Sequence, residues 1–88
     1  MTVLLHLCDV FFIRMEELLS IHDYEAVKER GRNVAFWRWA EGRTTDLSKG
    51  RQKAVVVTTN HVYISSISAR TLRKRAEEAC KGLMMTEV

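Results

Sequence analysis

A fifteen-residue run, KAVVVTTNHVYISSI at residues 53–67, constrains the fold of this 88-residue chain more than any other segment. Eight of the fifteen residues are β-branched, and such side chains pack well on a strand but are restricted in a helix. Asn60 tolerates the positive φ that a tight hairpin turn requires. The run therefore predicts two strands, residues 54–58 and 62–67, joined by a turn at residues 59–61.

The two predicted strands show the alternation of a half-buried sheet. Val55, Val57, Val62 and Ile64 recur at a period of two, so we expect these side chains to lie mainly on one buried face. Burial of Val62 within a strand is the observation that tests the hairpin.

A basic amphipathic helix is predicted directly after the hairpin. The segment SARTLRKRAEEACKGL begins at Ser68, whose hydroxyl can cap a helix, and Gly82 is a natural stop. Four of the six residues at 70–75 are cationic, whereas apolar residues recur at spacings of three and four. This apolar stripe consists of Ala69, Leu72, Ala76, Ala79 or Cys80, and Leu83.

The N-terminal half predicts three helices. Apolar residues at spacings of three and four favour one long helix over residues 3–21, and the segment MEELL has high helix propensity. The Val, Ile and Phe residues in the first third of this range favour a strand instead. A short helix is expected from about residue 22 to residue 30. A third helix, residues 34–41, would be capped by Asn33 and closed by Gly42.

Residues 42–52, GRTTDLSKGRQ, have the composition of a loop. We therefore expect a single small α+β domain, residues 1–88, with three short N-terminal helices, a two-stranded β-hairpin and a C-terminal basic amphipathic helix. This order matches the layout of a winged-helix DNA-binding domain, in which the third helix would enter the major groove. Phe36, Trp37 and Trp39 in that helix are instead typical of a core or an interface, because base-reading helices carry polar side chains.

The string ISARTLRKR, residues 67–75, resembles the start of the second helix in helix-turn-helix units, where a small capping residue and a Thr-Leu pair precede exposed cations. The resemblance covers nine residues and implies a DNA-binding unit in which VVVTTNHVYI is helical. The β-branched content of that segment favours the hairpin over this alternative.

Positive charge is concentrated in the second half of the chain. The first 41 residues carry five Lys/Arg against seven Asp/Glu, a net charge of −2, and the remainder carries nine against four, a net charge of +5. This asymmetry favours an anionic partner. The candidate phosphate-binding residues are Arg43, Lys49, Arg51, Lys53, Arg70, Arg73, Lys74 and Arg75.

Two hypotheses for function follow from these residues. The first is a small intracellular nucleic-acid-binding regulatory protein that uses the basic hairpin–helix surface, with DNA favoured over RNA. An alternative explanation for part of that surface is that Arg73 and Lys74 form surface ion pairs with the glutamates one helical turn later and bind no partner. The second hypothesis is a protein-binding modulator, such as a phage-type inhibitor of a larger complex, that binds an acidic protein surface. Trp39 and Arg38 would anchor that interface, because Trp and Arg are enriched at interface hot spots, whereas Trp37 is the better candidate for the core.

The sequence gives no reason to expect an enzyme, a metal site or a cofactor. It has no glycine-rich phosphate loop, no paired-carboxylate spacing and no Cys/His cluster. Cys8 and Cys80 are expected to be reduced and packed separately, which favours a cytoplasmic location. The apolar start, TVLLHLCDVFFI, is too short to span a bilayer, so no membrane contact is expected. A domain of this size is marginally stable, and pairing into a homodimer would relieve that.

Overall fold

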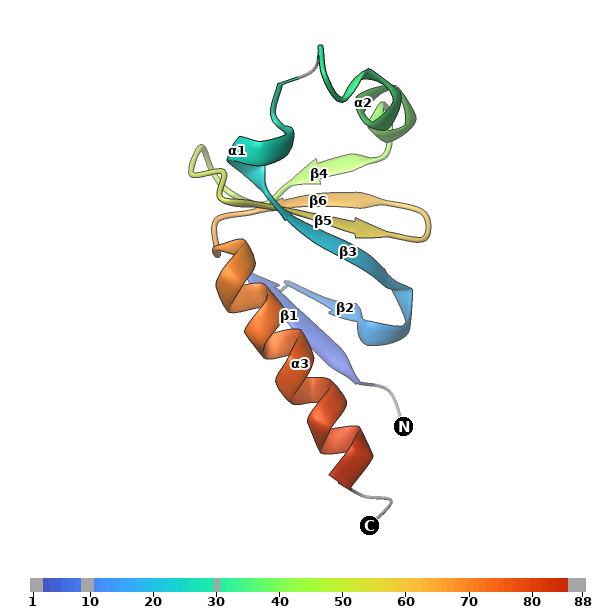
Figure 1. The fold of residues 1–88 in the computed structure, drawn as a ribbon, viewed down its shortest axis with the longest axis vertical. Helices are drawn as coiled ribbons and strands as arrows, with labels where there is room; N and C mark the ends of the chain where they lie inside the picture. Colours follow the sequence, from blue (N-terminus) through green and yellow to red (C-terminus); the bar gives the residue numbers. More distant parts are fainter. Residues whose placement is uncertain (1–2, 9–10, 30, 86–88) are drawn as a thin grey trace.

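The computed structural model describes residues 3–8, 11–29 and 31–85, with side chains as far as residue 80. The elements in chain order are β1 (Leu4–Cys8), β2 (Phe11–Arg14), the 3-10 turn η1 (Met15–Glu17), β3 (Leu18–Asp23), α1 (Tyr24–Val27), α2 (Val34–Ala40), β4 (Thr44–Asp46), β5 (Ala54–Thr58), β6 (Val62–Ser65) and α3 (Ala69–Met85). The fold is α+β, as expected, but strands rather than helices form its beginning (Figure 1).

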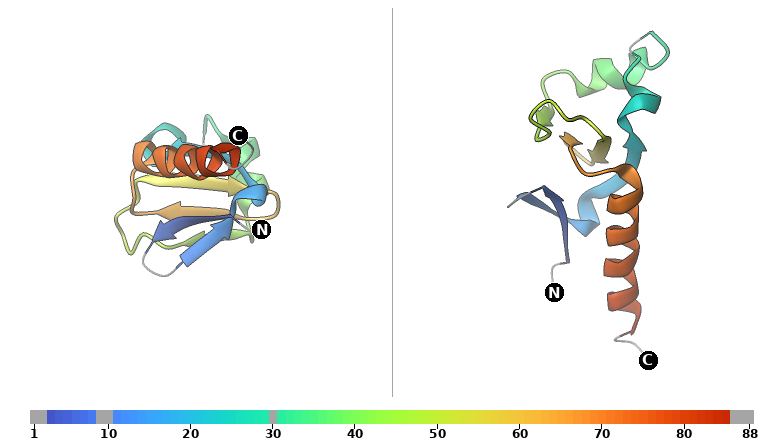
Figure 2. Two further views of the ribbon diagram at one scale, coloured as in Figure 1. Left: turned by 90° about the horizontal axis from the view of Figure 1, so that it is seen from below. Right: turned by 90° about the vertical axis from the view of Figure 1, so that its left-hand side faces the viewer.

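The strands are arranged in two sheets. β1 and β2 form a two-stranded antiparallel sheet, and the other strands form a sheet in the order β3-β5-β6-β4. β5 is antiparallel to both of its neighbours, whereas β4 runs parallel to β6 at one edge. α1 and α2 lie on one side of the four-stranded sheet, and α3 lies with the β1–β2 sheet on the other (Figures 1 and 2).

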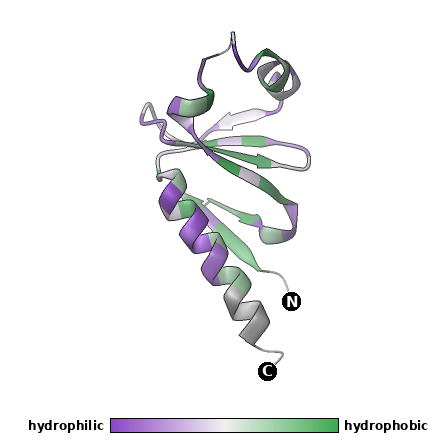
Figure 3. Ribbon diagram, viewed as in Figure 1, coloured by the Kyte–Doolittle hydropathy of each residue, from purple (hydrophilic) through white to green (hydrophobic). Residues whose placement is uncertain are grey.

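The four-stranded sheet is buried on both faces. On the α2 side the core consists of Trp37, Ala40, Val55, Val57 and Val62. On the α3 side it consists of Leu5, Leu7, Ile13, Ile21, Ala54, Val56, Ala69 and Leu72. The predicted placement of alternate hairpin residues on one buried face is therefore confirmed. Because the core on the α3 side buries the other face as well, the residues between them in β5 are also apolar. Figure 3 shows this contrast between the apolar strands and the hydrophilic first turns of α3.

The predicted hairpin is confirmed by β5 and β6. Val57 pairs with Val62, and the turn is closed by the backbone N of Thr58, which donates to the O of His61 at 2.9 Å. Val62 is fully buried within β6, so the helix-turn-helix alternative is wrong. β6 ends at Ser65, two residues earlier than expected.

The prediction of a long helix over residues 3–21 is wrong. This segment forms β1, β2, η1 and β3, so the winged-helix order of elements is not formed. Its apolar residues alternate, because Leu5 and Ile13 are buried while Leu4 and Phe12 are 52% and 49% exposed. MEELL forms only the turn η1 before entering β3, since pairing of β3 with β5 overrides local propensity.

The second and third predicted helices are present with corrections. α1 is shorter than expected, and α2 lies where it was predicted. The Asn33 side chain does not cap α2; its Nδ2 donates to the O of Val27 at 3.4 Å and to the O of Glu29 at 3.0 Å, which ties the connection back toward α1. Gly42 has a φ of +77°, the left-handed conformation expected of a residue that closes a helix.

The predicted C-terminal helix is confirmed as α3. The backbone N of Thr71 donates to the Ser68 hydroxyl at 3.2 Å, as expected for a cap. Ala69 and Leu72 are fully buried. The helix continues past Gly82 to Met85, so Gly82 is not its stop. Within the described part of the chain, the helices are all too short or too polar to cross a membrane.

Candidate nucleic-acid interface

Most of the predicted cations gather at one end of the four-stranded sheet. The backbone N of Lys53 donates to the O of Ser65 at 2.9 Å, which brings the segment 47–53 beside the turn that leads into α3 (Figure 1). We use the term basic surface for the exposed cations at this end, without Arg73, whose side chain is bonded to β3: Lys49, Arg51, Lys53, Arg70 and Lys74.

The loop that carries three of these cations is held by its own hydrogen bonds. Asp46 Oδ1 accepts from the backbone N of Ser48 at 2.8 Å and from its hydroxyl at 2.5 Å, and Ser48 is buried. The backbone N of Arg51 donates to the O of Ser48 at 3.1 Å. Lys49 and Gly50, which lie between, have φ angles of 54° and 87°. The glycine suits this left-handed turn, and the turn presents Lys49 and Arg51 to solvent in a defined conformation.

The four cations in the first two turns of α3 differ in what they contact. Arg70 and Lys74 lie one helical turn apart and are exposed on the side of the helix away from Leu72. Arg73 also faces solvent in part, but its Nη2 donates to the O of Ile21 in β3 at 2.8 Å. Of these four cations, Arg70 and Lys74 are therefore the two that are directed outward.

Arg75 is directed toward the protein as well. Its Nη1 lies 3.3 Å from Nδ1 of His6 and 3.4 Å from the O of His6, in β1. Arg73 and Arg75 thus hold α3 against β3 and β1, although neutral acceptors leave the guanidinium charge in place. Among the described side chains, Lys74 forms no ion pair with Glu78.

The remaining predicted cations, Arg43 and Arg38, lie at the opposite end of the sheet, with α2. The guanidinium of Arg43 lies 4.7 Å from the ring centroid of Trp39, a cation–π contact. Trp39 is half-buried rather than exposed, and its ring lies 6.4 Å from that of Phe36. Trp37 is in the core, as predicted, and its Nε1 donates to the O of Val27. The structure therefore does not bring Arg43 together with the basic surface.

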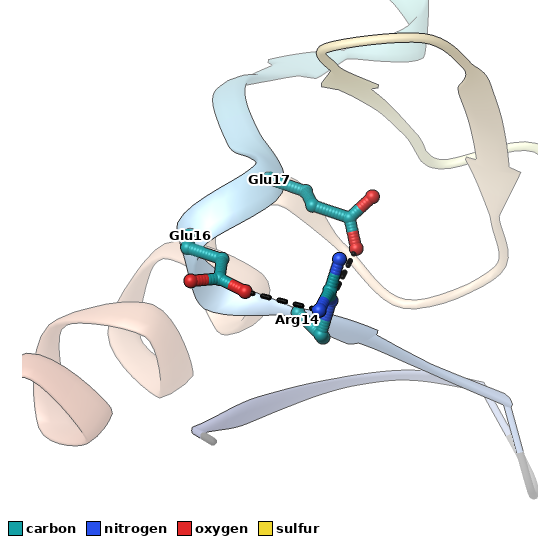
Figure 4. A network of polar contacts seen from close by, with 3 residues as sticks. All are labelled: Arg14, Glu16 and Glu17. Atoms are coloured by element: carbon teal, nitrogen blue, oxygen red, sulfur yellow. Dashed lines mark hydrogen bonds and ion pairs between the residues drawn. The ribbon is translucent and has the colours of Figure 1, made fainter. Parts of the chain in front are cut away.

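Several acidic side chains are paired locally and do not oppose the basic surface. Arg14 contacts Glu16 at 3.2 Å and Glu17 at 2.9 Å around η1 (Figure 4). The hydrogen bond and the charge of Glu17 raise the pKa of Arg14, and the charge of Glu16 raises it further. Lys28 pairs with Glu25 on α1 in the same way, and the pKa of Lys28 is raised.

The histidines and cysteines have structural contacts. His22 Nε2 lies 2.9 Å from the Ser20 hydroxyl, and His61 Nε2 lies 2.6 Å from the Thr45 hydroxyl. Both cysteines are free; Cys8 is half-buried in β1, but Cys80 is exposed, which corrects the expectation that both thiols are packed. Across residues 3–8, 11–29 and 31–80, no group of three His, Cys, Asp or Glu side chains is arranged to hold a metal ion.

Sequence reasoning missed β4 and the hollow beside it. Residues 42–52 were expected to form a loop, yet Thr44–Asp46 pair in parallel with β6. A hollow of about 450 Å³ lies between α2 and these strands, lined by Trp37, Ala40, Glu41, Gly42, Thr44 and Ile64. The weak signal was a pair of β-branched threonines after the glycine that ends α2.

The fold and the basic surface together define a small two-sheet α+β protein with a cationic helix–loop face and, within the described residues, no metal cluster. A family model described as RemA-like, extracellular matrix regulatory protein A-like, matches residues 4–76, and the chain belongs to this family. The chain is also 30% identical over 78 residues to extracellular matrix regulatory protein B of Bacillus subtilis (strain 168), with 83% of this chain and 89% of that protein covered.

Proposed function

We propose that this chain is a non-enzymatic regulatory protein that binds nucleic acid through the basic surface. The observation that carries the proposal is the convergence of two basic segments, distant in sequence, at one end of the sheet. Lys49, Arg51 and Lys53 come from an ordered loop, and Arg70 and Lys74 come from the adjacent helix. The names of the family and of its Bacillus relative, both of which contain the word regulatory, support the regulatory part of the proposal.

The shape of this surface favours DNA over RNA. α3 contains 17 residues and is therefore about 25 Å long, and its outward cations follow one side of the helix. The major groove of B-form DNA admits a helix, whereas the major groove of A-form RNA is too deep and narrow for one. The helix α3 carries lysine and arginine but no Asn or Gln, so we expect it to make phosphate contacts with little sequence discrimination.

A salt titration tests the proposal. If each of the five cations neutralises one phosphate, the logarithm of the affinity for duplex DNA should fall against the logarithm of salt with a slope of about −4.5. Replacing Arg70 and Lys74 together by alanine should reduce the magnitude of that slope by about 2. Fluorescence anisotropy of a labelled duplex at several salt concentrations measures both quantities.

The matched control removes two exposed cations from the other end of the sheet. The variant Arg38→Ala/Arg43→Ala has the same net charge as Arg70→Ala/Lys74→Ala, but its changes lie outside the basic surface. Its salt slope should remain close to that of the parent. Equal losses in the two double variants would show that total charge alone drives binding, and an absence of any binding at low salt would refute the proposal.

A further inference from the structure

β4 leaves an open edge on the four-stranded sheet. β4 is the outermost strand and pairs with β6. Two backbone hydrogen bonds of 2.8 Å flank this pairing: the N of Val62 donates to the O of Arg43, and the N of Leu47 donates to the O of Ile64. Alternate residues of a strand face opposite edges, so the backbone groups of Thr44 and Asp46 face away from β6. An edge of this kind can pair with an added strand.

The opposite edge of the same sheet is covered. β3 is contacted by α3, and the Arg73 guanidinium donates to the O of Ile21 within that strand at 2.8 Å. Covering an edge with a helix and a charged side chain prevents further strand pairing. At β4 the described contact with α2 is made by a side chain, since the Thr44 hydroxyl donates to the O of Ala40 at 2.9 Å, and no described backbone hydrogen bond uses the outward groups of Thr44 and Asp46.

A groove with both polar and apolar lining residues runs beside the open edge. The hollow of about 450 Å³ places Trp37, Ala40 and Ile64 next to Thr44 of β4. A second hollow of about 240 Å³ shares Trp37 and Glu41 with the first and extends along α2 to Val34 and Arg38. The Val34 side chain is 54% exposed. Each hollow has room for a few side chains at most, which suits a short segment rather than a whole domain face.

We propose that this edge and groove bind an extended peptide segment of a protein partner as a fifth strand of the sheet. The backbone of the segment would pair with the outward groups of β4, and an aliphatic side chain would enter the larger hollow. Glu41, which lines both hollows and is exposed, would accept a lysine or arginine of the segment on the same face as the aliphatic residue.

The composition of β4 itself disfavours pairing with the β4 of a second copy. The sequence of this strand is Thr-Thr-Asp, so it offers no apolar side chain for the hollow. Pairing two such edges would also add the carboxylate of Asp46 to a rim that already carries Glu41.

The groove lies on the opposite side of the four-stranded sheet from the α3 part of the basic surface, whereas the loop part of that surface follows β4 directly in the chain. α2 lies on one side of the four-stranded sheet, and α3 lies on the other (Figure 1). A peptide in the groove would therefore leave Arg70 and Lys74 of α3 accessible to a duplex. The chain would then connect a protein to nucleic acid, and each contact can be removed without the other.

A peptide selection against the full chain tests the inference. The probe is a library of random heptapeptides displayed on phage, selected on the immobilised protein. Enriched peptides should carry an aliphatic residue two positions from a lysine or arginine, since residues two apart share a face of a strand. In ¹⁵N NMR titrations they should shift the backbone amides of Thr44 and Asp46 and the indole of Trp37 more than the indole of Trp39.

Matched charge reversals provide the controls. Glu41→Lys should weaken the enriched peptides at least tenfold, whereas Glu29→Lys, an equal change at an exposed residue outside the groove, should leave affinity unchanged. Arg70→Ala/Lys74→Ala should also leave peptide affinity unchanged, so failure here is distinct from failure of DNA binding. The inference is overturned if no peptide is enriched, or if the enriched peptides shift the amides of α3 instead. Self-association of the parent chain that Glu41→Lys abolishes would likewise overturn it, because the occupant would then be a second copy.

Discussion

Docking of α3 on the β1–β2 side of the molecule should depend on Leu72. This side chain is fully buried in the cluster that includes Leu5, Leu7 and Ile21. Leu72→Ala removes three carbons, which corresponds to about 2.4 kcal/mol of lost transfer free energy. The surrounding core relaxes only partly around the cavity that the substitution leaves, which raises the expected loss of unfolding free energy to about 3–4 kcal/mol. Leu72→Val removes one methylene and should cost about 1 kcal/mol.

Urea unfolding followed by tryptophan fluorescence measures this series, because both tryptophans lie in the α2 layer and report on global unfolding. With an m-value of about 1 kcal/mol/M, Leu72→Ala should lower the midpoint by about 3 M. Arg70→Ala, two residues away and exposed on the opposite side of the helix, should change the unfolding free energy by less than about 0.5 kcal/mol. Equal stability of Leu72→Ala and Arg70→Ala would refute the docking of α3 in this position.

Three further changes test other parts of the structure. Val62→Asp should destabilise the fold by several kcal/mol, enough to leave little native circular dichroism, because it places an unpaired carboxylate in a fully buried strand. Arg73→Ala should lower the thermal midpoint more than Lys74→Ala, since Arg73 alone of the two donates to the O of Ile21; equal midpoints would contradict that role. Burial, and secondarily the charge of Glu17, raises the pKa of Tyr63 above its usual value of 10.0. The folded state therefore holds this proton more tightly than the unfolded state, and the unfolding free energy should fall as the pH rises through and above 10, with Tyr63→Phe removing part of that decline.

The hairpin and α3 could be predicted because their signals are local. The run of β-branched residues at 55–58 and the cap at Ser68 specify a strand and a helix start without reference to distant segments. The first 21 residues carry no such unique signal. Leu4, Leu7 and Phe11 fit a helical spacing, while Leu5, Leu7 and Ile13 fit a strand, and only the pairing with distant strands selects between them.

The candidate site was predictable to the extent that it follows from the hairpin. Lys53 precedes β5 and Ser68 follows β6, so an antiparallel pair brings the basic loop and the basic helix together. The place of Arg43 depends instead on the parallel pairing of β4 with β6, which no local pattern signals. The open edge and its groove depend on that same pairing and were missed for the same reason.

The packing of the C-terminal helix α3 against the N-terminal β1–β2 sheet determines when the chain can fold. The Ser65 hydroxyl donates to the O of Leu7 at 2.7 Å across 58 residues, and Arg75 reaches His6 across 69 residues. Contacts of such long range are slow to form, because loop closure must precede any gain from packing. During synthesis β1 is made before α3, so the cluster that contains Leu5 and Leu7 stays incomplete until Ala69 and Leu72 follow. A chain interrupted before Ala69 is therefore expected to aggregate through its first strands rather than fold.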